Sequence, residues 1–422
     1  MTPRPIPPLR RRIDARVRVP ASKSVANREL VLSALADGRS ILDLGPFDPG
    51  ADVRTMREAV GTLGHRVEWD GRRVTVEGAR GGAPAVHASV DAADAGTVAR
   101  FLTALAALGR GRVTIDGSPR LRERPLAPLL AALRTLGATI EGDTLPLTVS
   151  GPLVGGEVEV SGAESSQFAS ALLLVGPAMP QGLRLRVSGT LVSAPFVSLT
   201  VASLRERGVE VGHPGPGEFD IRPQRIRARR LTIPGDATAA TYPAAAAAIL
   251  GGSVTIDDVD ARRADGGQGD VRFFDLLEEM GCSVDRRGGR VRVTRSGSLR
   301  GIVANVRDCS DVFPTLAAIA ACADTPTELA GIAHTRKQES DRIAAVADAL
   351  RAVGAGATEF TDTLRVEPGP LHGGVVDAAG DHRIAMAFSI LGLHVPGIAI
   401  EGAESVSKTF PDFYDMVREL TR

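Results

Sequence analysis

A unit of about 72 residues recurs along this chain and constrains its fold more than any other feature. Six segments each combine a helix-like run of small residues, a Gly turn and a β-rich run, as in GTVARFLTALAALGRGRVTIDG. They close on Gly45, Gly117, Gly189, Asp258, Gly331 and Gly402, with spacings of 72, 72, 69, 73 and 71 residues. So long a period indicates globular subdomains, because solenoid repeats span only about 20–50 residues.

A second series with the same period lies between these segments. Amphipathic helix-like runs end at Gly64, Gly137, Gly208, Gly281 and Gly354, spaced 73, 71, 73 and 73 residues apart. Gly at such a place is typical of a helix C-terminus, and alternating strands such as RRVTVEG follow. Each unit is therefore predicted to run helix, strand, helix, strand, strand.

The two ends of the chain suggest how the units are grouped. The sixth unit lacks closing strands after FPDFYDMVREL, whereas residues 11–19, RRIDARVRV, alternate as a strand does. We expect this stretch to complete the sixth unit, so that residues 1–20 belong with the C-terminal half. A chain of 422 residues is also too long for one ordinary core. The predicted domains are 21–232 and 1–20 plus 233–422, with three units each and a cleft between them.

Composition excludes several classes of function. Formal net charge is zero and aromatic residues are only 4%, which argues against a nucleic-acid partner. The three cysteines form no CxxC pair and the seven histidines show no HxxxH spacing, so we expect no metal. No apolar run of about 18 residues occurs, so we expect no membrane partner. The prediction is a protein of a reducing, cytoplasmic compartment.

Lysine is nearly absent, since Lys23, Lys337 and Lys408 are the only lysines among 50 basic residues. A retained Lys supplies a compact, mobile ammonium that Arg does not, although codon bias with three survivors is the plainer alternative. Lys23 lies beside one of the predicted helix starts, which carry polar residues elsewhere too: Ser24, Gly96–Thr97, Ser165–Gln167, Asp236–Thr238, Asp311 and Asp381–Arg383. Such residues are good N-caps, but helix N-termini also bind anions. No phosphate-binding loop of the nucleotide type is present, so any such anion belongs to a small substrate.

Eight motifs occur in the order and spacing of one family. They are PASKSVANR (20–28), DAGTVARF (94–101), LRERP (121–125), SSQF (165–168), SAPF (193–196), QESDR (338–342), DHRIAM (381–386) and KTFPD (408–412). Together they resemble the 5-enolpyruvylshikimate-3-phosphate synthases, and the resemblance spans essentially the whole chain. It implies an α/β (α+β) fold with two domains, an inside-out α/β barrel-like arrangement of three βαβαββ units each, six in total.

The resemblance also implies an activity. Members of that family transfer the enolpyruvyl group of phosphoenolpyruvate to the 5-hydroxyl of shikimate 3-phosphate, releasing phosphate through a tetrahedral intermediate. This reaction leads to chorismate and the aromatic amino acids. The family implies no cofactor, no metal and a monomer. The N-terminal domain would mainly bind shikimate 3-phosphate, and the C-terminal domain would supply the acid–base groups and clamp phosphoenolpyruvate.

Site residues carried over from the family fall into three overlapping sets. Asp311, Glu339 and Lys23 would be catalytic, with Asp311 accepting the proton of the attacking hydroxyl and Glu339 protonating the methylene carbon. Shikimate 3-phosphate would be bound by Lys23, Ser24, Arg28, Ser165, Ser166, Gln167, Ser193, Asp311, His334 and Gln338. Phosphoenolpyruvate would be bound by Lys23, Gly96, Arg124, Gln167, Arg342, Arg383 and Lys408.

Several positions depart from the family pattern. Gln338 occupies the place of a usual Lys, and Lys337 lies one position earlier, which is about 100° away on a regular helix. Phe196 replaces a common Tyr, His334 a common Asn, Asp94 a usual Asn and Phe101 a usual Pro. Each departure bears on substrate affinity and on sensitivity to glyphosate, a mimic of phosphoenolpyruvate.

Three alternatives stay open on the sequence. The sister transferase acting on UDP-N-acetylglucosamine uses a mobile-loop Cys near the Arg124 region, where this chain has none before Cys282. A secondary-metabolism enzyme acting on a related ring acid would account for Gln338 and Phe196. A non-catalytic phosphometabolite-binding homologue would not need both Asp311 and Glu339.

Overall fold

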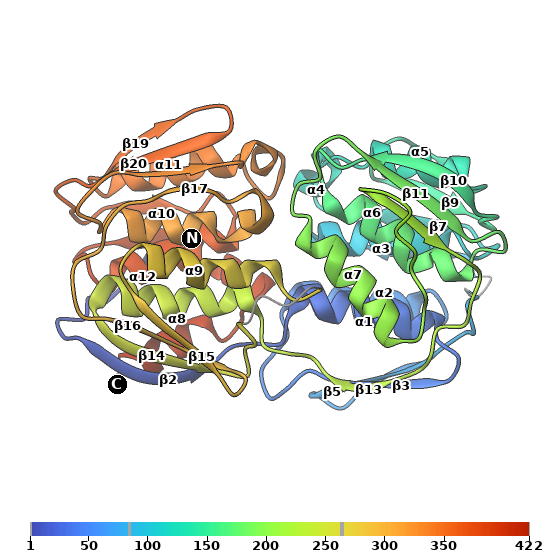
Figure 1. The fold of residues 1–422 in the computed structure, drawn as a ribbon, viewed down its shortest axis with the longest axis horizontal. Coiled ribbons are helices and arrows are strands. Elements are labelled where there is room, and N and C mark those ends of the chain that lie inside the picture. The colour runs from blue at the N-terminus through green and yellow to red at the C-terminus, as the bar shows by residue number, and fades with distance from the viewer. Residues whose placement is uncertain (1, 83–85, 262–265, 422) are drawn as a thin grey trace. The chain divides into compact units, whose positions relative to one another are not determined.

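The computed structural model describes residues 2–82, 86–261 and 266–421. They divide into two compact units (Figure 1). Unit 1 contains the N-terminal residues up to Ala21 and the part of the chain from Pro234 onward. Unit 2 runs from Ser22 to Ile233 and includes Gly266 and Gly267.

Unit 2 consists of helices surrounded by three sheets, whose strand orders are β13-β3-β5-β4, β6-β7-β9-β8 and β10-β11-β12. Its longer helices are α1 (Lys23–Leu35), α2 (Ala51–Thr62), α3 (Gly96–Ala106), α4 (Pro119–Glu123), α5 (Ala127–Thr135), α6 (Ser166–Val175) and α7 (Pro195–Glu206). Its strands are β3 (Arg39–Asp43), β4 (Val67–Trp69), β5 (Arg73–Glu77), β6 (Ala88–Asp91), β7 (Val113–Asp116), β8 (Thr139–Glu141), β9 (Leu147–Ser150), β10 (Gly156–Ser161), β11 (Leu183–Ser188), β12 (Glu218–Ile221) and β13 (Arg230–Thr232).

Unit 1 follows the same plan, with sheets β15-β16-β14-β2, β17-β18-β20-β19 and β1-β22-β21. Its helices are α8 (Ala237–Leu250), η2 (Gly269–Val271), α9 (Arg272–Glu279), η3 (Arg307–Val312), α10 (Phe313–Ala320), η4 (Ala333–Lys337), α11 (Arg342–Ala352), α12 (His382–Gly392), η5 (Ala403–Lys408) and α13 (Phe413–Leu420). Its strands are β1 (Arg4–Pro5), β2 (Ile13–Arg18), β14 (Gly252–Asp257), β15 (Ser283–Arg287), β16 (Arg290–Arg295), β17 (Val303–Asn305), β18 (Thr327–Ala330), β19 (Gly356–Glu359), β20 (Thr363–Glu367), β21 (Val375–Asp377) and β22 (Ala399–Glu401).

The six predicted repeats are confirmed by the sheets. Each sheet contains one parallel strand pair, and its other pairs are antiparallel. In four repeats the parallel strands follow one another with a buried helix between them, as in β6–α3–β7 and β17–α10–β18. The other two repeats receive their parallel strand from far along the chain: β13 pairs with β3, and β2 pairs with β14.

The expected partner of residues 11–19 was wrong. Strand β2 lies parallel to β14, from Ile13 opposite Gly252 to Arg18 opposite Asp257, and so completes the fourth repeat. This pairing buries Ile13 and Val17 in the core of unit 1. The sixth sheet is extended instead by β1, which pairs antiparallel with β22. The final helix, α13, packs against β2 rather than leading into a hairpin of its own.

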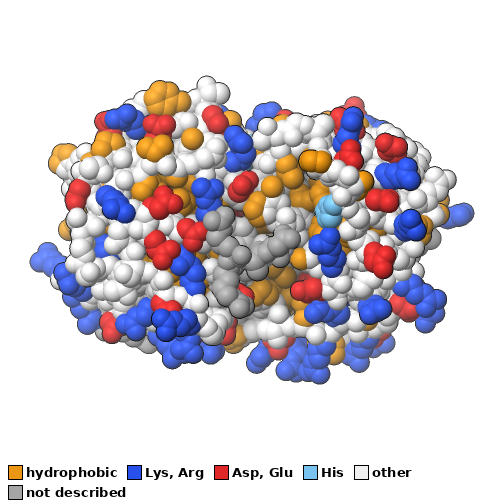
Figure 2. Space-filling model, viewed as in Figure 1, with side chains coloured by type: hydrophobic (Ala, Val, Ile, Leu, Met, Phe, Trp, Pro, Cys, Tyr) orange, Lys and Arg blue, Asp and Glu red, His pale blue; other side chains and the backbone are white. Residues whose placement is uncertain are grey.

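Helices form the interior of each unit and sheets the exterior. In unit 2, α1, α3 and α6 contact one another and are buried almost throughout, as are α8, α10 and α12 in unit 1. Small residues permit this, as in the run from Ala244 to Ala248 of α8. The sheets turn charged side chains outward, and Figure 2 shows Lys and Arg side chains gathered along the lower edge of each unit, where Figure 1 places β2, β14 and β15 of unit 1 and β3, β5 and β13 of unit 2. This inside-out arrangement leaves the N-termini of the interior helices as the places where polar residues gather.

The second series of glycines has a physical reason. Gly64, Gly137, Gly208, Gly281 and Gly354 all have φ between 81° and 110°, directly after α2, α5, α7, α9 and α11. Side chains other than Gly rarely adopt this left-handed conformation, which terminates helices. The sequence prediction of helix ends at these five positions is confirmed.

Candidate active site

The predicted site residues of unit 2 lie on its interior helices and at their starts. Lys23, Gly96 and Ser166 are the first residues of α1, α3 and α6, and Ser193 precedes α7 with a φ of 52°. The capping interpretation holds only in part: Ser165 accepts a hydrogen bond from the Gln167 backbone N–H, whereas α1 and α3 have no side-chain cap. Helices α1 and α3 therefore begin without the side-chain acceptor that usually satisfies a helix N-terminus.

In the described part of the chain, the Arg28 side chain donates its hydrogen bonds to neutral oxygen atoms. Its Nε donates to Thr200 Oγ1 at 2.7 Å, and its Nη atoms donate to Ser24 O at 2.7 Å and to Phe196 O at 2.9 Å. Burial lowers the pKa of Arg28 to about 9, which still leaves the guanidinium charged at neutral pH. Because none of the described carboxylates forms an ion pair with Arg28, its charge is suited to bind an anion.

Arg100 is a residue of this group that the sequence reasoning missed. Its Nη1 donates to Gln167 Oε1 at 2.6 Å and its Nη2 to Pro125 O at 2.8 Å, so it joins α3, α6 and the segment after Arg124. A Cβ on Gly96 would lie 2.8 Å from Arg100 Nη1 and 2.9 Å from Arg124 Nη2. Gly96 therefore lets two guanidinium groups approach the start of α3. Its place in the motif, one helical turn after Gly96, is the signal from which the sequence could have identified Arg100.

Lys23 has a carboxylate partner, because its Nζ lies 3.1 Å from Asp52 Oδ2 in the first turn of α2. The Lys23 side chain is 15% exposed and that of Asp52 is 6% exposed. Arg124 Nη1 contacts Asp94 O at 3.5 Å. Asp52 is a second residue that no motif had indicated, since an acidic residue in a first helical turn usually serves the helix alone.

In unit 1 the predicted residues form one connected network around Arg342, whose side chain is fully buried. Its Nε donates to Asp381 Oδ2 at 2.8 Å, its Nη2 to Glu339 Oε2 at 2.9 Å and its Nη1 to Asp311 Oδ1 at 3.2 Å. Burial alone would lower the pKa of Arg342, but Asp381, Glu339 and Asp311 raise it. Arg342 thus holds both predicted acid–base carboxylates in place.

Two more cations complete this network. Arg383 Nη2 donates to Asp311 Oδ2 at 2.7 Å, and Lys408 Nζ donates to Glu339 Oε1 at 3.2 Å. Burial works against the charge on Arg383, yet Asp311 raises its pKa above the ordinary value. Three cations and the three carboxylates of Asp311, Glu339 and Asp381 therefore balance one another.

Two of the positions that depart from the family pattern, Gln338 and His334, lie in unit 1, whereas Asp94, Phe101 and Phe196 lie in unit 2. Gln338 Oε1 accepts a hydrogen bond from Arg342 Nη1, a role that a Lys could not fill. His334 Nε2 lies 2.8 Å from Ser310 Oγ, and burial lowers the pKa of His334 to about 4, so the ring is neutral at pH 7. Lys337 is exposed, while Lys23 and Lys408 are largely buried and paired. Burial thus distinguishes Lys23 and Lys408 from Lys337.

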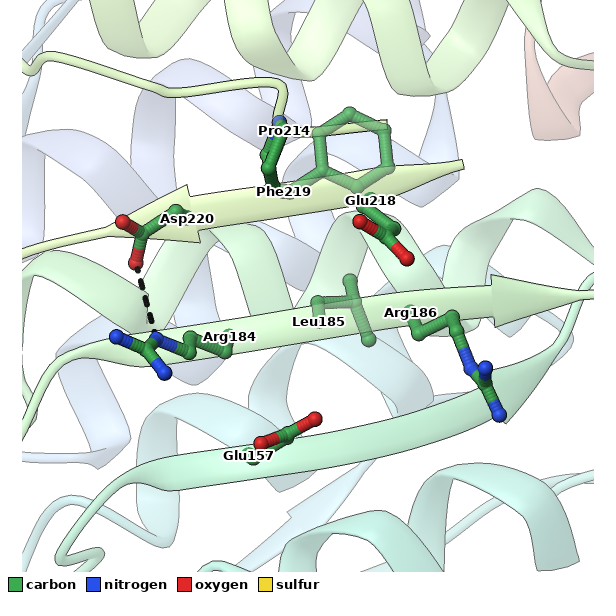
Figure 3. A pocket seen from close by; sticks show the side chains of 8 residues that line it. All are labelled: Glu157, Arg184, Leu185, Arg186, Pro214, Glu218, Phe219 and Asp220. Atoms are coloured by element: carbon green, nitrogen blue, oxygen red, sulfur yellow. Dashed lines mark ion pairs between the residues drawn. The ribbon is translucent and has the colours of Figure 1, made fainter. Parts of the chain in front are cut away.

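Two surface pockets of unit 2 lie apart from these residues. One, of about 340 Å³, lies on the outer face of sheet β10-β11-β12 and is lined by Glu157, Arg184, Leu185, Arg186, Pro214, Glu218, Phe219 and Asp220 (Figure 3). Its Arg184 pairs with Asp220 at 3.9 Å. The other, of about 430 Å³, follows α7 from Ala194 to Glu206. Neither is lined by a predicted site residue.

The described residues contain no group of three or more His, Cys, Asp or Glu side chains arranged to hold a metal ion. Within the same part of the chain, no helix has the length and apolar character needed to cross a membrane.

Comparison with known proteins identifies the class and then the family. A family model described as EPSP synthase (3-phosphoshikimate 1-carboxyvinyltransferase) matches residues 9–417. Curated 3-phosphoshikimate 1-carboxyvinyltransferases of Nostoc punctiforme and Methanosphaerula palustris are 39% and 38% identical over 417 and 410 residues, covering 97% and 96% of both chains respectively.

Solved structures agree. EPSP synthase of Acinetobacter baumannii matches with a TM-score of 0.81 at 27% identity, over 98% of this chain and 97% of that chain. The enolpyruvyl transferase NikO of Streptomyces tendae shares the fold with a TM-score of 0.77 at 20% identity, over 99% of this chain and 98% of that chain. The fold is therefore that of the enolpyruvyl transferases. Within that class, the chain belongs to the EPSP synthase family.

Proposed function

We propose that the two groups of residues described above divide the work of the EPSP synthase reaction between them. The reaction itself follows from the family: the chain transfers the enolpyruvyl group of phosphoenolpyruvate to the 5-hydroxyl of shikimate 3-phosphate, in aromatic amino acid biosynthesis. The products are 5-enolpyruvylshikimate 3-phosphate and phosphate. What remains to be assigned is the part that each residue plays.

The group in unit 2 binds mainly shikimate 3-phosphate. Its hydroxyls and amide, on Ser24, Ser165, Ser166, Gln167 and Ser193, suit the hydroxyls and phosphate of a phosphorylated ring acid. Arg28 supplies positive charge beside them, held by neutral oxygens. Lys23, Gly96 and Arg124 bind phosphoenolpyruvate near the start of α3. There, Arg100 holds Gln167 by a hydrogen bond.

The group in unit 1 clamps phosphoenolpyruvate and carries out proton transfer. Arg342, Arg383 and Lys408 bind its phosphate and carboxylate, because guanidinium groups bind such oxygens in pairs. Asp311 accepts the proton of the 5-hydroxyl as its oxygen bonds to C2 of phosphoenolpyruvate. Glu339 gives a proton to the methylene carbon, which yields the tetrahedral intermediate. His334 and Gln338 face the ring acid from the same group.

One observation carries this assignment most strongly: each proposed acid–base carboxylate is bonded to cations that would bind the substrate. Asp311 contacts Arg342 and Arg383, and Glu339 contacts Arg342 and Lys408. An arriving anion competes for these cations and weakens their hold on both carboxylates. Substrate binding thereby raises the basicity of Asp311 and the affinity of Glu339 for a proton. Proton transfer is thus prepared only when phosphoenolpyruvate is present.

The test is phosphate release by the purified protein given phosphoenolpyruvate and shikimate 3-phosphate. We expect release that depends on both compounds and forms one enolpyruvyl product per phosphate. Release no greater than without the acceptor would contradict the assignment. The same assay with shikimate and other ring acids examines the secondary-metabolism alternative, which Phe196 and Gln338 raise. Release only with such an acceptor would favour that alternative.

We further propose that the enzyme acts in the cytoplasm as a monomer without a nucleic-acid or membrane partner. A net charge of zero and a pI near 7.1 support the absence of a polyanionic partner. Light scattering at working concentration should give a mass near 44.0 kDa, and a mass twice that would contradict the monomer.

A further inference from the structure

Asp270 is a buried carboxyl group that the reaction as described does not use. It lies on η2, is only 2% exposed, and accepts a hydrogen bond from the Thr238 hydroxyl through Oδ2. Its other oxygen, Oδ1, is buried and accepts no hydrogen bond from any residue that the structure describes. A buried ionised carboxylate with one oxygen unsatisfied is costly, whereas a protonated carboxyl requires much less.

The backbone around Asp270 is held in a defined place. Gln268 Nε2 donates to Gly235 O at 2.8 Å, and its Oε1 accepts from the Ala237 backbone N–H at 3.0 Å. These bonds attach the start of η2 to the start of α8, where the chain has just re-entered unit 1 at Pro234. These bonds fix the backbone beside Asp270, which is itself buried.

The charge state of Asp270 depends on the network that contains Asp311. η2 packs against η3, which carries Asp311, and against α8 and α9. Burial and then the charge of Asp311 raise the pKa of Asp270 to about 7, opposed by the Thr238 hydrogen bond and Arg383. Asp236, the N-cap of α8, adds a weaker upward effect. On α9, the first-turn Asp275 is paired with Arg286 at 2.8 Å.

We propose that Asp270 and Asp311 form a coupled carboxyl pair in which Asp270 holds a proton in the resting enzyme and, as a positioning residue, sets the charge around Asp311 and Arg383. The proposal rests on the assignment of Asp311 as the proton acceptor. With Asp270 neutral, the three cations and three carboxylates of the network balance. Ionisation of Asp270 adds a fourth negative charge beside Arg383 and opposes the binding of an anion.

The pair also responds to the reaction. When Asp311 takes up the proton of the 5-hydroxyl, its negative charge disappears and the main charge that raises the pKa of Asp270 is lost. The free-energy cost of ionising Asp270 is then lower than in the resting enzyme.

The central experiment compares the KM for phosphoenolpyruvate of the wild type and Asp270→Asn between pH 6 and pH 8.5. Asn is neutral at every pH and keeps the shape of a protonated Asp. We expect the two proteins to have equal KM values near pH 6. Above pH 7 the KM of the wild type should rise relative to that of the variant. The rise should be on the order of tenfold for each unit by which bound phosphoenolpyruvate shifts the pKa of Asp270. The ratio cancels the titration of the substrate phosphates, which have a second pKa near 6.

Thr238→Val is the matched second variant. Losing the hydroxyl removes a hydrogen bond that favours ionised Asp270, so the rise in KM should move to higher pH rather than vanish. A purely structural role for Asp270 would instead change KM by the same factor at every pH in both variants, and that result would overturn the proposal.

Infrared spectroscopy provides a readout that does not depend on activity. The wild type at pH 6 should show the carbonyl band of a protonated carboxylic acid that Asp270→Asn lacks, and the band should fade by pH 8.5. No difference between the two proteins would overturn the proposal even if the enzyme is fully active. Conversely, a clear band in a protein that releases no phosphate would support the protonated state of Asp270 and would contradict the assigned reaction instead.

Discussion

The cations of the two units are stabilised in different ways. In unit 2, Arg28 and Arg100 donate to hydroxyl, amide and backbone oxygens, which are neutral. In unit 1, Arg342, Arg383 and Lys408 donate to carboxylates. A guanidinium held by neutral oxygens keeps its full charge for a ligand, whereas one held by a carboxylate must exchange partners when a ligand arrives.

Under the proposed assignment, this difference separates binding from chemistry. Unit 2 would bind the phosphorylated ring through cations that are held by neutral oxygens. Unit 1 would also move protons, through carboxylates that its cations release when the anion binds. Lys23, paired with Asp52, is the exception in unit 2 and resembles the cations of unit 1. Like Gln167, it is assigned to both substrates by the family resemblance.

The largest expected effect is that of Glu339→Gln. The variant keeps the size of the side chain, but its amide can accept a hydrogen bond from only one of Arg342 and Lys408, and it cannot act as an acid. We expect kcat to fall by about 10²–10⁴ while shikimate 3-phosphate still binds. Rapid-quench measurement of phosphate release, with calorimetry for binding, examines both. A loss of ring-acid binding equal to the loss of rate would contradict the proposed division between the units.

Removing a buried arginine should distinguish the units by stability. Arg342→Gln leaves three carboxylates without their shared partner, and we expect a loss of about 3–5 kcal/mol in the free energy of unfolding. Arg28→Gln, the matched change in unit 2, leaves only neutral acceptors and should cost about 1–3 kcal/mol. Urea unfolding followed by circular dichroism measures both. Equal losses of unfolding free energy in the two variants would contradict the difference between the two kinds of arginine site.

Replacing a retained lysine by Arg tests whether the lysines differ in their importance for activity. Lys23→Arg places a wider guanidinium against Asp52 in a largely buried site, and kcat/KM should fall by about tenfold or more, or about 1.4 kcal/mol. Lys337→Arg, at an exposed position, is the control and should stay within about twofold, less than 0.5 kcal/mol. Equal losses would mean that the near absence of lysine says nothing about function.

The smallest expected effect concerns the neutral partners of Arg28. Thr200→Val removes the hydroxyl that accepts from Arg28 Nε at 2.7 Å while keeping the shape of the side chain. We expect the KM for shikimate 3-phosphate to rise by about two- to tenfold with kcat unchanged, since one hydrogen bond to a charged donor is lost. Steady-state kinetics with both substrates varied would show this. A change in kcat alone would place Thr200 in the chemistry instead.

Much of the architecture was predictable because local rules decide it. The glycines after five helices mark left-handed residues that only Gly adopts readily, and their period revealed the repeats before any contact was known. Asp381 and Ser165 were predicted at helix starts, and both cap their helices. The family resemblance assigned Asp311 and Glu339 to catalysis and Arg342 to phosphoenolpyruvate binding, and all three lie in one hydrogen-bonded network.

Contacts between distant segments could not be read in the same way. Nothing in the alternation of residues 11–19 distinguishes β14 from the sixth sheet as a partner, because both offer a pattern of period two. The reach of Arg100 to Gln167 and of Lys23 to Asp52 depends on how α1, α2, α3 and α6 are stacked.

The sequence by itself determined the repeat, the helix ends and the family, because each depends on residues close together or on motifs with fixed spacing. The tertiary structure decided which charge meets which partner. It made Gln338 an acceptor for Arg342 and left Asp270 with a buried, unsatisfied oxygen near Asp311. The physical reason is that burial and opposing charge set the state of an ionisable group, and both arise only when distant segments fold against one another.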